Sequence, residues 1–484
     1  MTSFLAALAI LIGGYIIYGA FAEKVFGIDP KRPTPAITNA DGVDFVPMPA
    51  WKVFLIQFLN IAGLGPIFGA IMGIMFGPAA YLWIVFGTLF AGAVHDYVSG
   101  MISLRAGGVS LPEIVGRELG NSVKQVMRVF SVVLLILVGG VFVVTTSGLV
   151  ASLTPEKLNA SFWAIVIFAY YLVATMFPVD KVIGNIYPLF AGVLLFMAAG
   201  LVSVMLFGGL EVPDAFAGGI GNRYPAERQA AHPIFPMLFI SIACGAISGF
   251  HATQSPMMAR CMTNERLARP VFYGAMVAEG IVALIWAAAT ITFTQGYEGL
   301  ASYMAQPGHS PSSLIHDIST TWLGRIGGLI AVIGVIAAPV TTGDTALRSA
   351  RLIVADFTRF SQKRIWQRAL VSVPLFLLTF LVMKIDFNVL WRYFAWSNQT
   401  LAVFTLWAST VYLARHRRFY LITLIPAVFM TMVCTDYILV APSPEGFGIG
   451  NTLALVLSSA VTLLCTVLFA RYKRSLQATT EIVS

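Results

Sequence analysis

The sequence has few charged residues: only 11% of its 484 residues are Asp, Glu, Lys or Arg, whereas 58% are hydrophobic. A soluble domain of this length cannot bury so much apolar surface in its core. The composition therefore indicates an integral membrane protein. Basic loops on the cytoplasmic side of a membrane explain the net charge of +8, so we expect no nucleic-acid partner.

Cysteines and catalytic motifs are also scarce. The four cysteines contain no C-x-x-C pair and the six histidines are scattered, so neither a disulfide framework nor a metal cluster is indicated. The motifs G-x-S-x-G and G-x-x-x-x-G-K-[ST] do not occur. We therefore expect no enzyme, no cofactor and no bound metal.

Long hydrophobic runs are what the sequence does contain. A helix needs about 20 apolar residues to cross the hydrocarbon core of a bilayer. Windows of that length predict about thirteen transmembrane helices, near residues 2–22, 53–77, 80–104, 126–151, 161–178, 184–208, 234–258, 270–294, 324–348, 367–384, 391–413, 419–440 and 450–470.

The basic residues predict how the chain is oriented. With the N-terminus outside and the C-terminus inside, 24 of the 30 Lys and Arg residues lie on the cytoplasmic side of the cytoplasmic (inner) membrane. The outside then receives only Lys157, Arg223, Arg228, Arg325, Lys384 and Arg392. Two long loops, 209–233 and 295–323, are also expected outside.

The second run is interrupted at membrane depth by Asn60, Gly63, Gly65 and Pro66. Pro66 removes a backbone donor and clashes with the preceding turn, while the glycines tolerate the dihedral angles that follow. We expect the helix to break there. Backbone groups freed inside a bilayer must find partners in protein, water or ligand, so the break is a candidate binding site.

The seventh run contains a related interruption with Gly245, Ser248 and His251. Each interruption lies in the first helix of a set of five, and because five is odd the two sets start from opposite sides of the membrane. This arrangement is typical of a five-plus-five inverted repeat with two discontinuous helices, as in LeuT-like transporters. Alternatively, the glycines only allow close helix packing.

The repeat hypothesis divides the chain into five regions. They are an N-terminal extra helix and cytoplasmic loop (1–52), a first five-helix repeat (53–208), an external loop (209–233), a second, inverted repeat (234–414), and two C-terminal helices with a short cytoplasmic tail (415–484).

Ionisable side chains at membrane depth are candidates for function. Four acids qualify: Asp96, Glu279, Asp344 and Asp436. The sequence indicates no partner for Glu279 or Asp436. Asp96 follows His95, and because neighbours at i and i+1 lie on different helix faces, we expect these two side chains to have different partners.

The ninth run offers oxygen ligands for a cation. The Ala338 carbonyl and the hydroxyls of Thr341 and Thr342 stand at i, i+3 and i+4, and a small cation prefers such oxygens. Alternatively, the two hydroxyls bond back to their own helix and Asp344 pairs with Arg348 one turn on. For Ser397, Asn398 and Gln399 we expect hydrogen bonds between helices.

Six segments carry a family resemblance: DGVDFVP at 41–47, IAGLGPI at 61–67, GAVHD at 92–96, IACGAISGFH at 242–251, DTALR at 344–348 and SNQ at 397–399. In these segments the chain resembles the carbon starvation protein A family of transporters, and its length is similar to that of the short branch. The resemblance implies a secondary transporter of the amino acid, polyamine and organocation superfamily, with peptides or pyruvate as substrate.

The resulting prediction is a cation-coupled symporter that imports a small carboxylate such as pyruvate, or short peptides. The expected substrate-binding residues are Asn60, Gly63, Gly65, Pro66, Gly245, Ser248 and His251. The expected ion-coupling residues are Asp96, Ala338, Thr341, Thr342 and Asp344, with H⁺ or Na⁺ as the ion. A channel and a nutrient receptor are the alternatives, and the sequence leaves the oligomeric state open.

Overall fold

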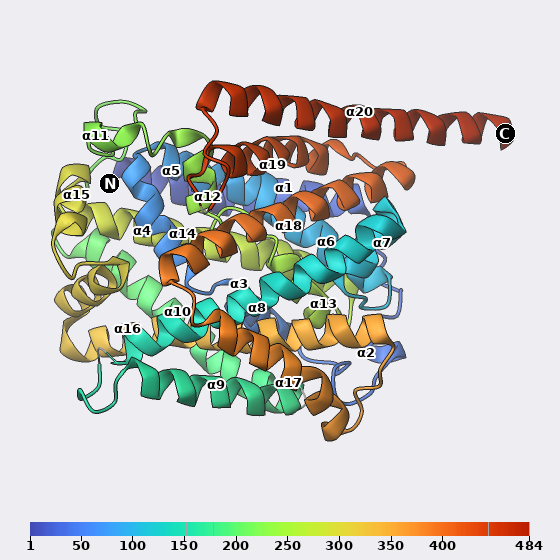
Figure 1. Ribbon diagram of the computed structural model, residues 1–484, viewed down its shortest axis with the longest axis horizontal. Coiled ribbons are helices and arrows are strands. Elements are labelled where there is room, and N and C mark those ends of the chain that lie inside the picture. Colours follow the sequence, from blue (N-terminus) through green and yellow to red (C-terminus); the bar gives the residue numbers. More distant parts are fainter. Residues whose placement is uncertain (152, 178, 444, 484) are drawn as a thin grey trace.

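The computed structural model describes residues 1–151, 153–177, 179–443 and 445–483, with their side chains outside 179–186, 387–388 and 478–483. This part of the chain is built of helices and loops and contains no strand. The long helices lie side by side, and α20 extends along one edge beyond the others (Figure 1).

Nine described helices are long and apolar enough to cross a membrane, and the bent pair of α3 and α4 makes a tenth. Three further predicted runs coincide with the shorter apolar helix α9, with α18, and with a region around 234–259 where the helix is broken. All thirteen predicted runs therefore correspond to a helix or a broken helix. Residue 178, the expected end of the fifth run, lies outside the described residues.

The first set of five begins with a broken helix. Its elements are α3 (Ala50–Ile61), α4 (Gly65–Gly73), η1 (Ile74–Phe76), α5 (Ala79–Leu82), the π-helix η2 (Trp83–Gly92), α6 (Ala93–Arg105), α8 (Asn121–Ala151), α9 (Ala160–Met176) and α10 (Val179–Phe207).

The second set also begins with a broken helix. Its elements are η3 (Ile234–Leu238), α12 (Phe239–Ser241), α13 (His251–Ala259), η4 (Glu265–Leu267), η5 (Arg269–Gly274), α14 (Ala275–Phe293), α16 (Pro311–Thr358), α17 (Ile365–Val382) and α18 (Phe387–Arg415).

The remaining helices flank these sets or connect their members. They are α1 (Thr2–Phe26), α2 (Pro35–Thr38), α7 (Leu111–Leu119), α11 (Ala226–Gln229), α15 (Tyr297–Ala305), α19 (Leu421–Val440) and α20 (Asn451–Val483).

Helix packing is reciprocal between the two sets. The half-helix α4 of the first set packs against α14 of the second, and the half-helix α13 of the second packs against α6 of the first. The third helices of both sets, α8 and α16, pack against each other. An inverted repeat produces such an exchange of partners, because a two-fold axis in the membrane plane relates the halves.

Burial separates a central group of helices from an outer one. In the most apolar stretch of 265–293, 83% of the residues are buried, compared with 22% in α1 and in α20. The exposed side chains of α20 include Leu453, Val456, Leu463 and Leu468. Lipid tails cover such apolar surface in a bilayer, so the polar centre is enclosed by helices that face lipid.

The region 295–323 contains helical segments where we expected a loop, and it ends at Gly324, whose φ of +68° breaks α16 where the ninth run was predicted to begin. It contains α15 and the first turns of α16, which starts at a capping box: the Ser310 hydroxyl accepts from the Ser313 amide at 3.3 Å, and the Ser313 hydroxyl accepts from the Ser310 amide at 2.8 Å. Pro311 occupies the first helical position, where a missing amide donor costs nothing. Hydropathy alone overlooks these start signals.

Candidate functional site

The two helix interruptions lie against each other. The first break (residues 62–64) separates α3 from α4, and the second break (residues 242–250) separates α12 from α13. A Cβ atom on Gly65 would lie 2.1 Å from the Cys244 Cβ, and one on Gly245 would lie 3.4 Å from the Pro66 Cα. Gly245 also has a φ of +93°, which favours glycine. Glycine at these positions therefore allows the two broken helices to touch.

The first break leaves side-chain amides without partners. Asn60 and Gln57, at the end of α3, are fully buried, and neither the nitrogen nor the oxygen of either amide has a hydrogen-bond partner among the described residues. Buried polar groups are normally paired, and an unpaired one costs about 1–3 kcal/mol. Gln57 was missed in the sequence although it lies one turn before Asn60.

The second break is held by neighbouring helices. Asn398 of α18 accepts hydrogen bonds at Oδ1 from the Phe250 amide (2.7 Å) and the Ser248 hydroxyl (3.0 Å), and its carbonyl accepts from the Gly249 amide (3.2 Å). On the other side, Thr88 of η2 donates to the Gly245 carbonyl at 2.9 Å. The expected interhelical role of Asn398 is confirmed, whereas no pattern pointed to Thr88.

A cluster of oxygen atoms joins the first break to α16. The Ala338 carbonyl accepts from the hydroxyls of Thr341 (2.8 Å) and Thr342 (2.9 Å), and the Thr342 hydroxyl also lies 3.2 Å from the Leu59 carbonyl of α3. The structure thus brings Ala338, Thr341 and Thr342 together and adds Leu59. The alternative prediction, in which the hydroxyls of Thr341 and Thr342 bond back to their own helix, is also confirmed by these contacts.

Asp344 lies beside this cluster, because the Tyr187 hydroxyl that it binds also lies 3.1 Å from the Thr341 carbonyl. One of its oxygens accepts from the Tyr187 hydroxyl of α10 at 2.7 Å, and the other is buried with no hydrogen-bond partner among the described residues. Arg348 donates instead to backbone carbonyls, those of Ala174 (2.6 Å) and Phe177 (3.0 Å). The side chains that the structure describes therefore show no ion pair between Asp344 and Arg348.

Asp96 is bound on both sides. Its Oδ1 lies 2.7 Å from His95 Nδ1 and its Oδ2 lies 2.9 Å from His251 Nδ1 of α13, and all three side chains are fully buried. The expectation of different partners for His95 and Asp96 was wrong, because one carboxylate oxygen contacts its neighbour while the other reaches across to the second set. Asp96 and His251, expected in different sites, are in contact.

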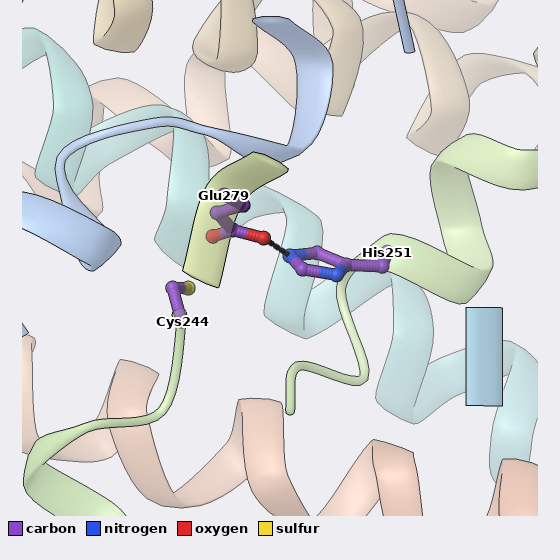
Figure 2. A group of neighbouring side chains, drawn as sticks. All are labelled: Cys244, His251 and Glu279. Atoms are coloured by element: carbon purple, nitrogen blue, oxygen red, sulfur yellow. Dashed lines mark ion pairs between the residues drawn. The ribbon is translucent and has the colours of Figure 1, made fainter. Parts of the chain in front are cut away.

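Glu279 of α14 continues this group. Its Oε2 lies 3.4 Å from His251 Nε2, and the carboxylate is fully buried. A dashed line marks this ion pair in Figure 2. Cys244, His251 and Glu279 offer ligand atoms that lie within 4.8 Å of one another. Neither the metal-type grouping nor the role of Glu279 was visible in the sequence, because the three residues come from separate segments.

A cavity of about 570 Å³ opens near one end of α4. Its lining includes Phe68 of α4 and Trp391 of α18, together with Arg228 and His232 from the region between the two sets. Phe68 lies three residues beyond Gly65, and its ring is 6.1 Å from that of Trp391. The cavity therefore reaches the helix that begins at the first break.

Asp436, which the sequence left unassigned, lies away from these groups. Its Oδ1 accepts from the Ser458 hydroxyl at 3.0 Å, which joins α19 to α20. This contact gives Asp436 a role in packing the last two helices.

Two broken helices in contact at the centre of a five-plus-five inverted repeat define a secondary transporter of the LeuT-like fold. Carbon starvation protein CstA is the family whose pattern matches this chain, over residues 1–162 and 144–326. The chain belongs to the carbon starvation protein CstA family.

Several relatives are similar to this chain over part of its length. A membrane protein of Haemophilus influenzae is 43% identical over 62% of this chain and 93% of its own. The peptide transporter CstA of Campylobacter jejuni is 32% identical over 58% of this chain and 48% of its own length. The pyruvate/proton symporter BtsT of Escherichia coli is 29% identical over 58% of this chain and 47% of its own length. This chain thus spans about half the length of the two named transporters.

Solved structures share the fold. A Na⁺-coupled sialic acid symporter in a substrate-bound outward-open state matches with a TM-score of 0.53 at 14% identity, over 97% of each chain. MhsT in complex with L-phenylalanine matches with a TM-score of 0.52 at 15% identity, over 85% of this chain and 98% of that chain. The inverted repeat expected from the sequence is confirmed.

Proposed function

We propose that the protein is a cation-coupled symporter that imports a small carboxylate such as pyruvate, or short peptides, without converting it chemically. The observation that carries this proposal is the contact between the two breaks, with buried amides of Asn60 and Gln57 unpartnered beside it. The named relatives, a peptide transporter and a pyruvate/proton symporter, support the substrate class.

The substrate site lies between the breaks in this proposal. The half-helices α4 and α13 begin at Gly65 and His251, and the first amides of a helix carry the positive end of its dipole, which favours a carboxylate. Asn60 supplies a free amide at this place. The proposed contacts are Asn60, Gly63, Gly65, Pro66, Gly245, Ser248 and His251.

The oxygen cluster between α3 and α16 is the proposed cation site. Leu59, Ala338, Thr341 and Thr342 supply four oxygen atoms, and hard cations such as Na⁺ bind carbonyl and hydroxyl oxygens. A cation there would link the position of α3, and thus of the first break, to α16. Asp344 and Asp96 are the proposed alternatives for a proton.

The proposal includes the membrane setting. We place the chain in the cytoplasmic membrane with the N-terminus outside, since most Lys and Arg residues then face the cytoplasm. We retain 53–208 and 234–414 as the repeats, with 1–52, 209–233 and 415–484 outside them.

Uptake into proteoliposomes tests this function. Labelled pyruvate and a labelled dipeptide are offered in parallel under an imposed proton gradient and then a sodium gradient. We expect concentrative uptake of one of them under one gradient. Flux without accumulation would identify a channel, and binding without flux would identify a receptor; either result contradicts the proposal.

The Thr341→Val/Thr342→Val protein tests the cation site in the same assay. We expect it to lose sodium-driven accumulation if sodium drives the wild-type protein. Thr345→Val is the matched control, because the Thr345 hydroxyl is equally buried on α16 and donates to the carbonyls of Thr341 and Thr342 within its own helix. Equal losses in both proteins would remove the oxygen cluster from the coupling mechanism.

A further inference from the structure

The group of Asp96, His251 and Glu279 joins three helices at the centre of the molecule. Asp96 lies on α6, His251 is the first residue of α13, and Glu279 lies on α14. Both ring nitrogens of His251 therefore face a carboxylate, Nδ1 at 2.9 Å from Asp96 and Nε2 at 3.4 Å from Glu279. All three side chains have no exposed surface.

The contacts require a shared proton. Since the Asp96 carboxylate only accepts, the His251 Nδ1 carries a hydrogen, and a neutral imidazole then has a bare lone pair at Nε2. That lone pair faces a Glu279 oxygen, so the contact is favourable only when one proton lies on Nε2 or on the carboxyl group. Without it, two acceptors face each other in a dry site, which is costly.

No fixed cation replaces this proton among the described side chains. The titratable groups beside His251 are Asp96 and Glu279, which contact its ring nitrogens, and Cys244 of the second break. The helix α16 also packs against α13, and three of its charged side chains have other partners: Asp344 binds Tyr187, Arg348 binds backbone carbonyls, and Arg351 pairs with Asp44 at 3.3 Å. No described side chain donates a hydrogen bond to Glu279.

We propose that Asp96, His251 and Glu279 form the proton-binding site of the carrier, with the transported proton held between His251 Nε2 and the Glu279 carboxylate. This inference rests on the proposed symport function and assigns a role to Glu279. Asp96 fixes the imidazole, and Glu279 exchanges the proton.

The site also connects proton binding to helix position. His251 starts α13, directly after the second break, so it moves with the half-helix that faces the substrate. Protonation holds the His251 ring against Glu279 of α14, and loss of the proton sets two acceptors against each other and separates the two side chains. Substrate and proton thus act on the same half-helix from its two sides.

Proton–substrate flux in proteoliposomes is the functional test. For Glu279→Gln we expect that proton-driven accumulation falls by at least about tenfold, a change of about 1.4 kcal/mol, while exchange of labelled for unlabelled substrate is still measurable. Glu279→Asp keeps a carboxyl group and should retain accumulation with a shifted pH dependence. Full proton-driven accumulation by Glu279→Gln would overturn the proposal.

Asp436→Asn is the matched control, because Asp436 is another buried acid of a membrane helix but binds only Ser458 in this structure. We expect this variant to keep its accumulation. Equal losses in Glu279→Gln and Asp436→Asn would contradict a specific proton site. Exchange that is absent in the wild-type protein would instead contradict the proposed function itself, so the two failures are distinguishable.

Infrared difference spectroscopy of the purified protein between acid and alkaline pH tests proton binding without transport. We expect a protonated-carboxyl band that titrates in the wild-type protein and is missing in Glu279→Gln. The same band in both proteins would overturn the proposal. Transport that is lost with EDTA and restored by Zn²⁺ would also overturn it, since the Cys244, His251 and Glu279 group would then hold a metal.

Discussion

The two breaks occupy equivalent places in the repeat but differ in how their polar groups are satisfied. The first break is three residues long, and beside it the amides of Asn60 and Gln57 are buried without partners. The second break is nine residues long, and Asn398 and Thr88 bind its backbone. The two breaks are therefore equivalent in the repeat, but the hydrogen bonding of their polar groups differs.

This difference suggests separate tasks for the two breaks. Unpaired polar groups at the first break are available to a ligand, because a bound carboxylate or peptide can supply the missing hydrogen bonds. At the second break neighbouring helices already bind the backbone at Gly245, Gly249 and Phe250, and its end carries His251 in contact with two carboxylates. We therefore assign substrate capture mainly to the first break and proton binding to the second.

The largest expected effect comes from separating the breaks. In Gly65→Ala, the new methyl group would lie 2.1 Å from the Cys244 Cβ, so one helix must shift. Overpacking of this kind costs about 1–3 kcal/mol or more, and we expect a lower melting temperature and loss of uptake.

A second substitution checks this cause. Cys244→Gly removes the opposing Cβ, so the Gly65→Ala/Cys244→Gly protein should regain stability. Gly13→Ala is the control, since nothing lies within 4 Å of the new atom, and it should leave the melting temperature unchanged or raise it. No recovery in the double variant would show that the two breaks are not in direct contact.

The next effect, on stability alone, is expected when the second break loses its partner Asn398. Asn398→Ala leaves the Phe250 amide and the Ser248 hydroxyl without their acceptor. Each buried unpaired group costs about 1–3 kcal/mol, so thermal unfolding should occur at a lower temperature. An unchanged melting temperature would mean that Asn398 does not hold the second break.

The smallest loss is expected at the link between the first break and α16. Thr342→Val removes the hydrogen bond to the Leu59 carbonyl, which contributes about 1 kcal/mol. Thermal unfolding should detect a modest decrease that is absent in Thr345→Val, whose hydroxyl bonds only within α16. A larger decrease of the melting temperature in Thr345→Val than in Thr342→Val would contradict the proposed link between α16 and the first break.

Much of the fold was predictable because the bilayer imposes it. Hydrocarbon thickness sets the length of each apolar run, and Pro66 with its neighbouring glycines marks a break by steric rules alone. The thirteen predicted runs therefore match helices, whereas the region 295–323, expected as a loop, contains helical segments that end at Gly324, since its capping residues act through local hydrogen bonds rather than through hydropathy.

The candidate site was only partly predictable. Asn60, His251 and Asp344 stand out as polar residues in apolar runs, but their partners come from distant segments. Glu279 meets His251 only in the folded chain, because the two residues lie on separate helices, and Leu59 contributes a carbonyl, which every residue has. A single sequence contains no signal for either contact.

The first break provides the most direct test of the account. In Asn60→Leu an apolar side chain of similar size replaces a buried amide that has no protein partner. Melting temperature is measured with and without the substrate that the wild-type protein accumulates. We predict that Asn60→Leu melts at a higher temperature than wild type without substrate and gains no stability when substrate is added. A lower melting temperature with a full substrate-induced increase would show that Asn60 serves the fold, and would contradict its assignment to the substrate.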